Sequence, residues 1–437
     1  MFYKKRFSLP QDFNVGRILL NVGACDQICE VFVNGKYVES HKGGYLPFSI
    51  DITNFLLEGE NQEIVFRVQD NANSDVYGRG KQVYKPGGIW YKATSGLWQS
   101  VWLESVPSQY IKSIKYDIDF DNKKLITTCE IKAFYKLSES LKISVLDENQ
   151  VIEEKSVFVD FSDEKNNLIN LNEEFCVFKT KIVLDVKNCK PWTPDSPELY
   201  KIKIEYMKDT VDSYFGLRKF SVIEKNGKKF FAINNEPIFH NGLLDQGYWH
   251  KSYYTPPSNK AMFDEIKNVK NLGFNMLRKH IKVEPYLWYY YCDILGILVW
   301  QDMINGGKKY PAWRIALCPF FDFHLNDKNY KLMGRSEDSR NQYYQEAFDM
   351  IDSLYNCVSL YLWTPFNEAW GQFDTLEVLN KLKQKDSSRL YDHASGWQDK
   401  KGGDVCSKHI YFRKARMKND KNRVLALTEF GGYSLPL

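Results

Sequence analysis

The first hundred residues alternate between apolar and polar positions with the two-residue period of β-strands. Residues 28–33 read Ile-Cys-Glu-Val-Phe-Val, and the Asn34-Gly35 dipeptide that follows is the strongest short signal for a hairpin turn. Further strands are predicted over 62–68 and 97–103. The pattern predicts an all-β domain over residues 1–108, built as a sandwich or a jelly roll.

Residues 109–222 keep the same period and form a second predicted β domain. The predicted strands are 112–120, 124–135, 141–146, 175–186 and 199–206. A proline-rich stretch over 191–197 interrupts the pattern and predicts a loop. The spacing of the strands favours a small sandwich of about 100 residues.

After Ser221 the pattern changes, because short apolar runs now alternate with helical periods. The predicted strands are 238–244, 275–277, 298–301, 358–363, 390–393, 409–412 and 424–428. Strands that alternate with helices are typical of a βα barrel or a doubly wound parallel sheet. A third domain is therefore predicted over residues 223–437.

One helix of this third domain can be delimited from its sequence. Ser258 is placed to cap its N-terminus, and Met262, Ile266 and Val269 recur at the spacing of a single helical face. Gly273 follows as the expected stop. A buried strand starting at residue 275 should come directly after this helix.

Two glutamates follow predicted barrel strands. The run 358–363 leads into Asn367-Glu368, and the run 424–428 leads into Glu429. Reactive groups of a βα barrel lie just past the carboxyl ends of its strands. A single glutamate at such a place is more often a helix N-terminal residue or a surface charge, but two of them can form the carboxyl pair that cleaves a glycosidic bond.

The motifs with the most specific sequence are Asn367-Glu368, Thr428-Glu429-Phe430-Gly431, Asn275-Met276-Leu277-Arg278, Tyr214-Phe215-Gly216-Leu217-Arg218 and Gly96-Leu97-Trp98-Gln99. With these motifs the sequence resembles glycoside hydrolase family 2, the family of β-galactosidases, β-glucuronidases and β-mannosidases, over essentially its whole length. The resemblance implies a jelly-roll sugar-binding domain, an immunoglobulin-like sandwich and a (β/α)8 TIM barrel, in that order. It also implies a retaining, exo-acting hydrolase of β-linked sugars.

The resemblance assigns roles to five residues. Glu368 matches the acid/base of the family and Glu429 the nucleophile. Asn367 matches the residue that contacts the sugar 2-hydroxyl, and Arg278 the residue that keeps the nucleophile ionised. Tyr411 is similar to the tyrosine that donates a hydrogen bond to the nucleophile, with a packed barrel residue as the alternative.

Other strand-end and aromatic residues are candidates for the walls of the pocket. They are Asp245, His280, Asp302, His409 and Trp397, together with Trp363, which would give Glu368 an apolar flank. For the polar residues the alternative is helix capping or packing in the barrel, and for the tryptophans it is an ordinary place in the core. The Trp90 segment is interpreted as core or domain interface.

Composition and charge exclude several classes of function. Basic and acidic residues nearly balance, 59 against 55, without the basic stripe of a nucleic-acid surface. The nine cysteines show no CxxC or Cys/His spacing, which argues against a disulfide framework and a zinc site and favours a reducing, cytoplasmic location. No apolar run approaches the ~20 residues of a membrane span. We expect a carbohydrate substrate, no nucleic-acid or membrane partner, no organic cofactor and no metal.

The position of Glu429, eight residues before the last residue, predicts a barrel without its last strand and its last helices. The first domain is also expected to start late compared with the family. A second copy of the chain, or a C-terminal fragment that completes the barrel, would then be the protein partner. The alternatives to an active enzyme are a catalytically inactive fragment or a carbohydrate-binding protein, and a metal-dependent barrel hydrolase.

Overall fold

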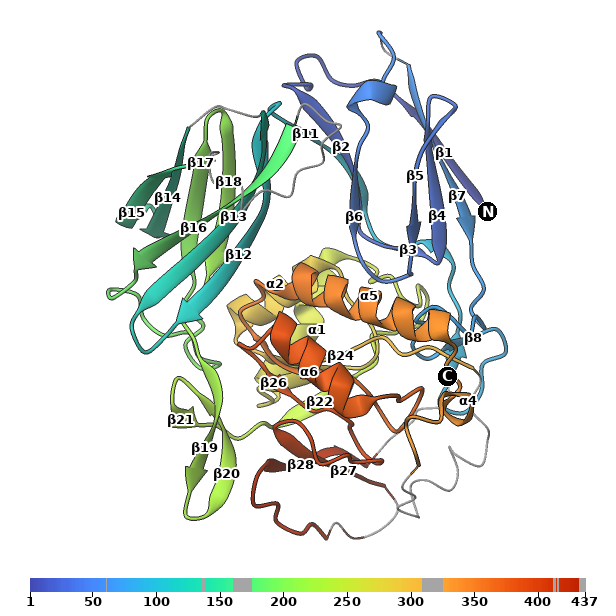
Figure 1. Ribbon diagram of the computed structural model, residues 1–437, viewed down its shortest axis with the longest axis vertical. Helices are drawn as coiled ribbons and strands as arrows, with labels where there is room; N and C mark the ends of the chain where they lie inside the picture. The colour runs from blue at the N-terminus through green and yellow to red at the C-terminus, as the bar shows by residue number, and fades with distance from the viewer. Residues whose placement is uncertain are drawn as a thin grey trace.

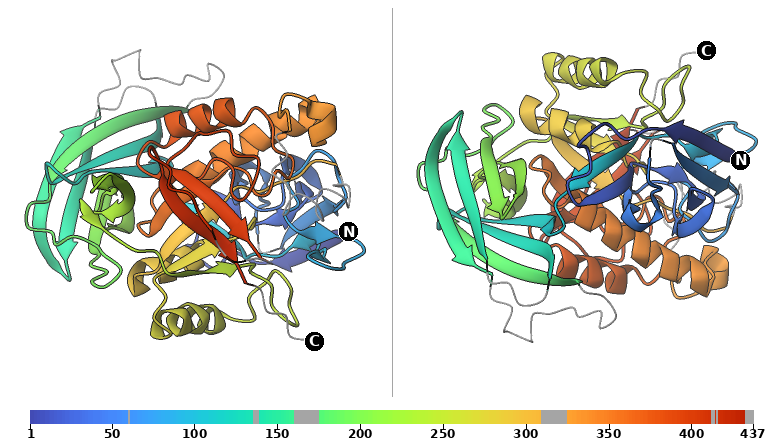
Figure 2. Two further views of the ribbon diagram at one scale, coloured as in Figure 1. Left: turned by 90° about the horizontal axis from the view of Figure 1, so that it is seen from below. Right: turned by 90° about the horizontal axis from the view of Figure 1, so that it is seen from above.

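Three domains follow one another along the chain in the computed structural model, which describes residues 1–59, 61–134, 139–159, 175–308, 325–411, 414 and 416–431. The two β domains lie side by side, and the α/β domain lies beneath both of them in the view of Figure 1. In the view from below, the red strands β27 and β28 of the third domain face the viewer (Figure 2). The three-domain architecture predicted from the sequence is confirmed.

The first domain is a β-sandwich. An antiparallel sheet in the order β1-β7-β4-β5 faces a sheet in the order β11-β2-β6, and a core that includes Ile18, Val31 and Phe66 lies between them. The predicted hairpin is present, because Asn34 and Gly35 both adopt the positive φ that this turn requires. The elements are β1 (Phe2–Phe7), β2 (Arg17–Val22), β3 (Cys25–Asp26), β4 (Ile28–Val33), β5 (Lys36–Lys42), β6 (Phe48–Asp51), η1 (Thr53–Phe55), β7 (Gln62–Gln69), β8 (Gln82–Val83), β9 (Tyr91–Lys92), β10 (Gly96–Leu97) and β11 (Val101–Val106).

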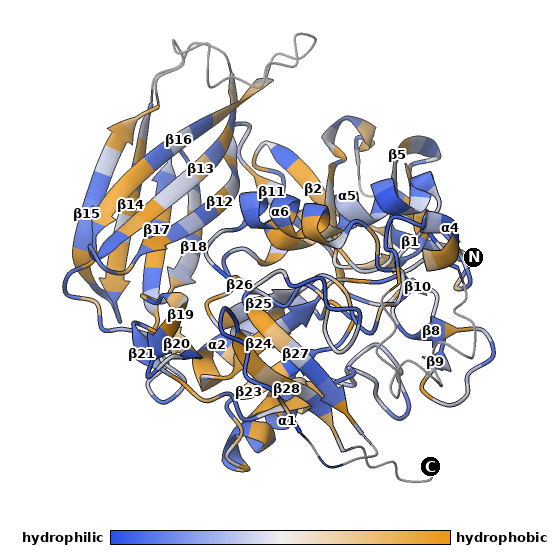
Figure 3. Cartoon of the chain, turned by 60° about the horizontal axis from the view of Figure 1, so that its bottom comes forward, coloured by the Kyte–Doolittle hydropathy of each residue, from blue (hydrophilic) through white to orange (hydrophobic). Residues whose placement is uncertain are grey.

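The second domain is a smaller sandwich of two antiparallel sheets. Their orders are β12-β13-β16 and β15-β14-β17-β18, and hydrophilic and hydrophobic colours alternate along these strands in Figure 3. The predicted loop over 191–197 carries Trp192, which is fully buried and donates its indole N–H to the carbonyl of Asp293 in the third domain. The elements are β12 (Tyr110–Asp119), β13 (Lys124–Phe134), β14 (Ser140–Asp147), β15 (Gln150–Phe158), β16 (Phe175–Asp185), β17 (Tyr200–Tyr206) and β18 (Asp209–Phe215).

The third domain carries parallel strands with helices on their outer side. A small antiparallel sheet, β19-β20-β21, leads into it, and the parallel strands run in the orders β22-β23-β24-β25-β26 and β27-β28. The elements are β19 (Phe220–Lys225), β20 (Lys228–Ile233), β21 (Glu236–Pro237), β22 (Gly242–Asp245), α1 (Asn259–Asn271), β23 (Met276–Lys279), α2 (Tyr286–Leu295), β24 (Leu298–Asp302), α4 (Tyr330–Met333), α5 (Glu337–Leu354), β25 (Leu360–Thr364), α6 (Thr375–Lys385), β26 (Leu390–Tyr391), β27 (Val405–Ile410) and β28 (Val424–Phe430).

Local sequence accounts well for α1. The Ser258 hydroxyl accepts a hydrogen bond from the backbone N–H of Ala261, and the buried residues are the predicted Met262, Ile266 and Val269. Gly273 follows with φ +87°, a conformation that favours glycine at the end of a helix. Each predicted barrel strand has a counterpart, although the sixth begins four residues earlier than predicted, at Val405. Positions 135 and 412 of the predicted strands lie outside the described residues.

Two findings concern the described part of the chain in all three domains. Among the described residues no helix is both long enough and apolar enough to cross a membrane. Eight cysteines in the described part of the chain are buried and carry free thiols.

Candidate active site

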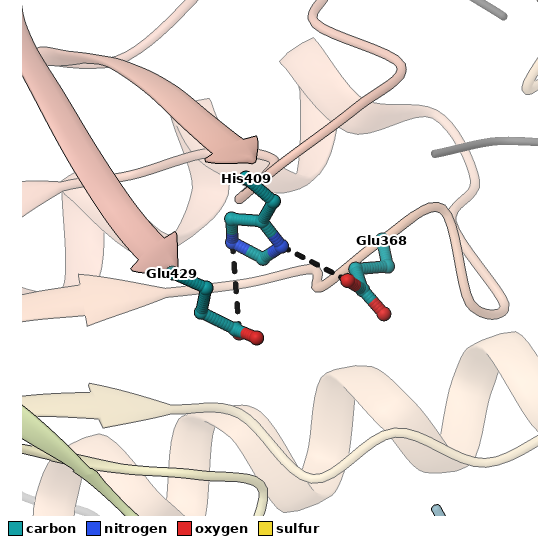
Figure 4. Close-up of side chains that lie close together, drawn as sticks. All are labelled: Glu368, His409 and Glu429. Atoms are coloured by element: carbon teal, nitrogen blue, oxygen red, sulfur yellow. Dashed lines mark hydrogen bonds and ion pairs between the residues drawn. The ribbon is translucent and has the colours of Figure 1, made fainter. Parts of the chain in front are cut away.

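The two glutamates predicted from the sequence meet at the carboxyl ends of the barrel strands. Figure 4 shows Glu368 and Glu429 on either side of the His409 ring. One carboxylate oxygen of each glutamate and one nitrogen of His409 lie within 4.8 Å of one another. Each glutamate side chain is about 11% exposed, so the pair is nearly enclosed while still open to a ligand.

The backbone around Glu368 holds this side chain in place. Asn367 forms a parallel bridge with Ser395, and the N–H of Glu368 donates to the carbonyl of Ser395 over 2.9 Å. Glu368 and Ala369 have φ values of +50° and +63°, in the left-handed region that costs a non-glycine residue about 1–2 kcal/mol. Such strained backbone often occurs where a functional side chain must be aimed away from the regular chain path.

Glu429 and His409 come from neighbouring strands. They are paired across the parallel strands β28 and β27, directly after an irregularity of the register between Lys408 and His409. An irregularity of this kind re-aims the side chains that follow it. His409 therefore shares one strand edge with Glu429, and its Nδ1 lies 3.0 Å from Oε1 of Glu368.

Tyr411 joins the two carboxyl groups directly. Its hydroxyl lies 2.9 Å from Oε1 of Glu368 and 2.5 Å from Oε2 of Glu429. A phenol has one hydrogen, so it can donate to only one of these oxygens at a time. Both contacts are satisfied when Tyr411 donates to an ionised Glu429 and accepts a hydrogen bond from a protonated Glu368.

Arg278 gives the site its fixed positive charge. Its guanidinium makes a two-pronged ion pair with Asp302, and its Nη1 donates to Oε1 of Glu429 over 2.9 Å. Nη2 also donates to the side-chain oxygen of Asn367 over 2.9 Å. Burial alone would raise the pKa of Glu429, but the positive charges of His409 and Arg278 and the Tyr411 hydroxyl hold that pKa well below its usual range.

His280 completes the buried network through Asp302. Its Nδ1 lies 2.8 Å from Oδ2 of Asp302, and the ring is 3% exposed. Burial and the nearby charge of Lys81 lower the pKa of His280, which favours the neutral ring. A neutral His280 that donates from Nδ1 to Asp302 leaves Nε2 as a hydrogen-bond acceptor.

Several buried polar atoms around these residues have no protein partner in the described part of the chain. They are Nε2 of His280, Nδ2 of Asn367, and both side-chain polar atoms of Asn305. Buried polar groups are nearly always satisfied, by protein, water or a ligand. A substrate rich in hydroxyl groups would supply the missing partners for the ones that face the site.

Of the two tryptophans predicted to line the pocket, one lies at the site and the other does not. Trp397 is half-buried at the site, with its ring centre 5.4 Å from that of His409 and 6.2 Å from that of Tyr411. The assignment of Trp363 was wrong, because its side chain is fully buried between the strands and the helices and its indole N–H donates to Asp386. It therefore cannot flank Glu368.

Asp245 lies outside the network around Arg278, and its assignment to the substrate pocket stays a prediction. Its carboxylate accepts from Nζ of Lys279 over 2.7 Å and from the backbone N–H of Gly247. Lys279 in turn pairs with Glu284 over 2.8 Å. This cluster shapes the loop after β22 and leaves Asp245 bound within the protein.

Two residues near the site, Lys81 and Asn305, were missed by reasoning from the sequence. Lys81 and Trp90 belong to the first domain, yet the Trp90 ring packs against Trp370, two residues after Glu368, with ring centres 5.2 Å apart. Asn305 follows β24 and holds the Lys81 segment by its backbone carbonyl. The clue available in the sequence was the aromatic stretch at Trp90, which does form part of the domain interface predicted for it.

Glu368, His409 and Glu429 are also the group in the described residues with the geometry to hold a metal ion. Their facing atoms already contact one another, Tyr411 and Arg278. A cation at this place would compete with the charge of Arg278 for Glu429. The arrangement fits proton transfer and nucleophilic attack between two carboxyl groups.

Family models match nearly the whole chain. The description "Glycosyl hydrolases family 2, sugar binding domain" matches residues 1–107, "Glycosyl hydrolases family 2" matches 109–218, and "Glycosyl hydrolases family 2, TIM barrel domain" matches 223–429.

Individual proteins resemble the chain at lower identity. A putative β-glucuronidase of Formosa agariphila is 25% identical over 84% of this chain and 40% of its own length. A β-galactosidase of Thermoanaerobacter pseudethanolicus is 22% identical over 100% of this chain and 54% of its own length. A β-galacturonidase structure from Eisenbergiella tayi superposes with a TM-score of 0.73 at 18% identity, over 100% of this chain and 74% of that one. The chain thus spans about half the length of the curated relatives it matches.

Proposed function

The chain belongs to glycosyl hydrolases family 2, and from this membership we propose that it is a retaining glycosidase that releases a terminal β-linked sugar. The observation that carries the proposal is the distance between the two carboxyl groups. Oxygens of Glu368 and Glu429 lie within 4.8 Å of each other. Retaining glycosidases separate their carboxyl groups by about 5–5.5 Å, whereas inverting ones need about 6.5–9.5 Å to admit a water molecule.

In the first step Glu429 attacks the anomeric carbon and Glu368 protonates the departing glycosidic oxygen. The carbon–oxygen bond to the leaving group breaks as the bond to Glu429 forms, and the alcohol departs with the proton from Glu368. Arg278 and Tyr411 support this assignment, because they favour the ionised form of Glu429 that a nucleophile needs.

In the second step water replaces the leaving group. Glu368, now a carboxylate, removes a proton from this water, which attacks the anomeric carbon and breaks its bond to Glu429. The sugar leaves with its original anomeric configuration and Glu368 is protonated again. His409 lies within hydrogen-bonding distance of Glu368 and can hold its carboxyl group in position through both steps.

The unpartnered atoms of the site support a sugar as the substrate. Nδ2 of Asn367 and Nε2 of His280 offer one hydrogen-bond donor and one acceptor in a nearly closed site. Trp397 adds a half-exposed aromatic face beside Tyr411, of the kind that stacks on sugar rings. The curated relatives are named as galactosidases and glucuronidases, which supports a β-linked hexose or hexuronic acid as the glycone.

Chemical rescue tests the role of Glu429. The variant Glu429→Gly should have no measurable activity on aryl β-glycosides, and added azide should restore turnover with a glycosyl azide as the product. Azide fills the space of the removed carboxylate and attacks the anomeric carbon in its place. A folded Glu429→Gly protein that azide fails to rescue, made from an active parent chain, would contradict the nucleophile assignment.

Leaving groups test the role of Glu368. Glu368→Ala should lower kcat/KM by about 10²–10⁴-fold for alkyl glycosides, which need protonation, and far less for dinitrophenyl glycosides, which do not. Equal losses for both classes of substrate would contradict the acid role. If the unaltered chain binds sugars but hydrolyses none of them, the non-catalytic carbohydrate-binding alternative takes the place of this proposal.

We also propose that the chain works in a reducing compartment. The eight buried cysteines of the described residues are all free thiols, as is usual for cytoplasmic proteins. Mass determination of the protein isolated from its host, with and without a thiol-blocking reagent, would reveal any disulfide that contradicts this location.

A further inference from the structure

A segment of the first domain is docked against the mouth of the barrel. Gly78 forms an antiparallel bridge with Gly306, and the N–H groups of Arg79 and Gly80 both donate to the carbonyl of Asn305. The guanidinium of Arg79 also donates to the carbonyl of Gly307 over 2.9 Å. Figure 1 shows β8, which begins right after this segment, beside the barrel elements.

The docking leaves little freedom for the residues of this segment. Gly80 has φ +59°, and a side chain there would bring a Cβ within 2.6 Å of the carbonyl oxygen of Ile281. A glycine at this position therefore permits the close approach of the two domains. Because the backbone is fixed on both sides, the next residue, Lys81, is held in one place before any substrate binds.

Lys81 is a buried cation without a partner of opposite charge among the described residues. Its side chain is only 9% exposed, and Nζ lies over the Trp370 ring, 5.5 Å from the ring centre. Within the described residues its Nζ makes no hydrogen bond or ion pair. Lysine is almost never this buried unless it is paired, and the cation–π contact alone is worth only about 0.5–2 kcal/mol.

Lys81 lies near the catalytic carboxylates, because the Trp370 ring beneath its Nζ belongs to the residue two positions after Glu368. Burial lowers the pKa of Lys81, while the charges of Glu429 and Glu368 oppose that change. Its own charge also helps to lower the pKa of His280. Nevertheless, Lys81 is not the counter-ion of the pair, because Arg278 already pairs with Glu429, and His409 and Tyr411 contact Glu368.

We propose that Lys81 is a specificity-determining residue, whose ammonium binds an acidic group, a carboxylate or a sulfate, on the sugar held between Glu368 and Glu429. This inference rests on the proposed glycosidase function. An anionic substituent would supply the partner that the buried ammonium lacks in the described part of the chain, and the ion pair would form in a region from which water is largely excluded. Asn305 lies beside the segment with both polar atoms of its buried amide unpartnered in the described chain, and it offers further hydrogen bonds.

The test compares substrates that differ in charge. Aryl β-D-glucuronide and β-D-galacturonide carry a carboxylate, a sulfated aryl galactoside carries a sulfate, and the corresponding glucoside and galactoside are neutral. We expect the unaltered chain to prefer at least one acidic substrate. Lys81→Gln should lower kcat/KM for that substrate by about 10²-fold, as is typical when one member of a buried charge pair is removed. For the neutral substrates the change should stay within about threefold.

Two further variants make the test specific. Lys81→Arg keeps the charge and should retain part of the preference for the acidic substrate, because only the geometry of the donor changes. Lys92→Gln is the matched control, because Lys92 belongs to the same domain and lies 5.5 Å from the centre of the Tyr253 ring, but is exposed. It should leave both classes of substrate unchanged. Equal losses for acidic and neutral substrates with Lys81→Gln, or no loss for either class, would overturn the proposal.

Direct binding separates this inference from the proposed function. Calorimetric titration with glucuronate, galacturonate, a sulfated galactose, glucose and galactose requires no turnover. If the chain hydrolyses nothing but binds an acidic sugar in a Lys81-dependent manner, the hydrolase proposal fails and the role of Lys81 stands. If hydrolysis occurs and neither hydrolysis nor binding depends on the charge of Lys81, the hydrolase proposal stands and the role of Lys81 fails. If neither hydrolysis nor Lys81-dependent binding is found, both fail.

Discussion

Two neighbouring residues of β23, Arg278 and Lys279, belong to two buried charge clusters, one at the catalytic glutamates and one bonded to the surrounding backbone. Successive side chains of a strand point to opposite faces of the sheet. Arg278 therefore points toward the catalytic glutamates, and Lys279 points toward the helices, where it lies over the Trp288 ring of α2, 4.4 Å from its centre. The cluster of Arg278 contains Asp302 and Glu429. The cluster of Lys279 contains Asp245 and Glu284, to which Lys282 is also paired.

The two clusters differ in the groups that their charges face. Lys282 donates to the backbone carbonyls of Gly247 and Tyr254, so the Lys279 cluster ties its charges to the chain that surrounds it. The Arg278 cluster instead ends at Glu429, whose carboxylate faces a second glutamate, Glu368, across the His409 ring. A charge cluster that is bonded to the surrounding backbone stabilises a loop, whereas one that ends at two facing carboxyl groups can act on a ligand. Burial and charge alone would not distinguish them.

Removal of the arginine should have the largest effect. Arg278→Met leaves Glu429 and Asp302 without their cation, and one of the two must then take up a proton at neutral pH. We expect kcat/KM for aryl β-glycosides to fall by about 10⁴-fold, and the free energy of unfolding in urea to fall by about 3–5 kcal/mol. Activity retained within tenfold would contradict the role of Arg278 in keeping the nucleophile ionised.

Removal of the lysine should affect stability alone. Lys279→Met keeps the packing on Trp288 but leaves Asp245 and Glu284 without their shared cation, which should lower the free energy of unfolding by about 3–5 kcal/mol. At a temperature where the variant is folded, kcat/KM should stay within about threefold of the original. A loss of activity as large as that of Arg278→Met would show that the two clusters work as one.

How well the sequence predicted a feature depends on how far apart along the chain the residues that form it lie. The cap and face of α1 and the Asn34-Gly35 hairpin depend on neighbouring residues, and both were predicted correctly. Glu368 and Glu429 could be proposed because each follows its own apolar strand. The docking of Lys81 on the barrel, in contrast, depends on contacts with residues more than 200 positions away, such as Asn305, which no local pattern reveals.

The sequence also does not reveal which side chains of a buried strand point to the site. All five residues of β25 are buried, as is usual for parallel strands covered on both faces, so no alternation of apolar and polar residues shows which side chains point to the site. This is why Trp363 was assigned to the pocket. Arg278 and Lys279 present the same difficulty, because both are charged and buried, and only the resemblance to a family favoured the former.

An intermediate effect is expected from the hydroxyl that joins the carboxyl pair. Tyr411→Phe removes a hydrogen bond to Glu429, so the pKa of Glu429 should rise toward its ordinary value. Glu429 must be ionised to attack, so activity is lost as the pH falls through its pKa. The acid limb of the kcat/KM profile should therefore move to higher pH, and kcat should fall by about 10²-fold. A profile that stays in place would contradict the contribution of Tyr411 to the ionisation of Glu429.

The smallest effects distinguish two tryptophans assigned to the pocket from the sequence. Trp397→Phe reduces the aromatic surface beside Tyr411 and should raise KM several-fold while the free energy of unfolding changes by less than about 1 kcal/mol. Trp363→Phe leaves the buried carboxylate of Asp386 without one donor and opens a space in the core, so it should lower the free energy of unfolding by about 1–3 kcal/mol. Its KM should be unchanged, because the ring is fully buried between β25 and α6, away from the carboxyl pair. KM for Trp363→Phe is measured on the same aryl glycoside. A rise in this KM would show that Trp363 does line the pocket, and the two tryptophans would then no longer differ in whether they stabilise the barrel or contact its ligand.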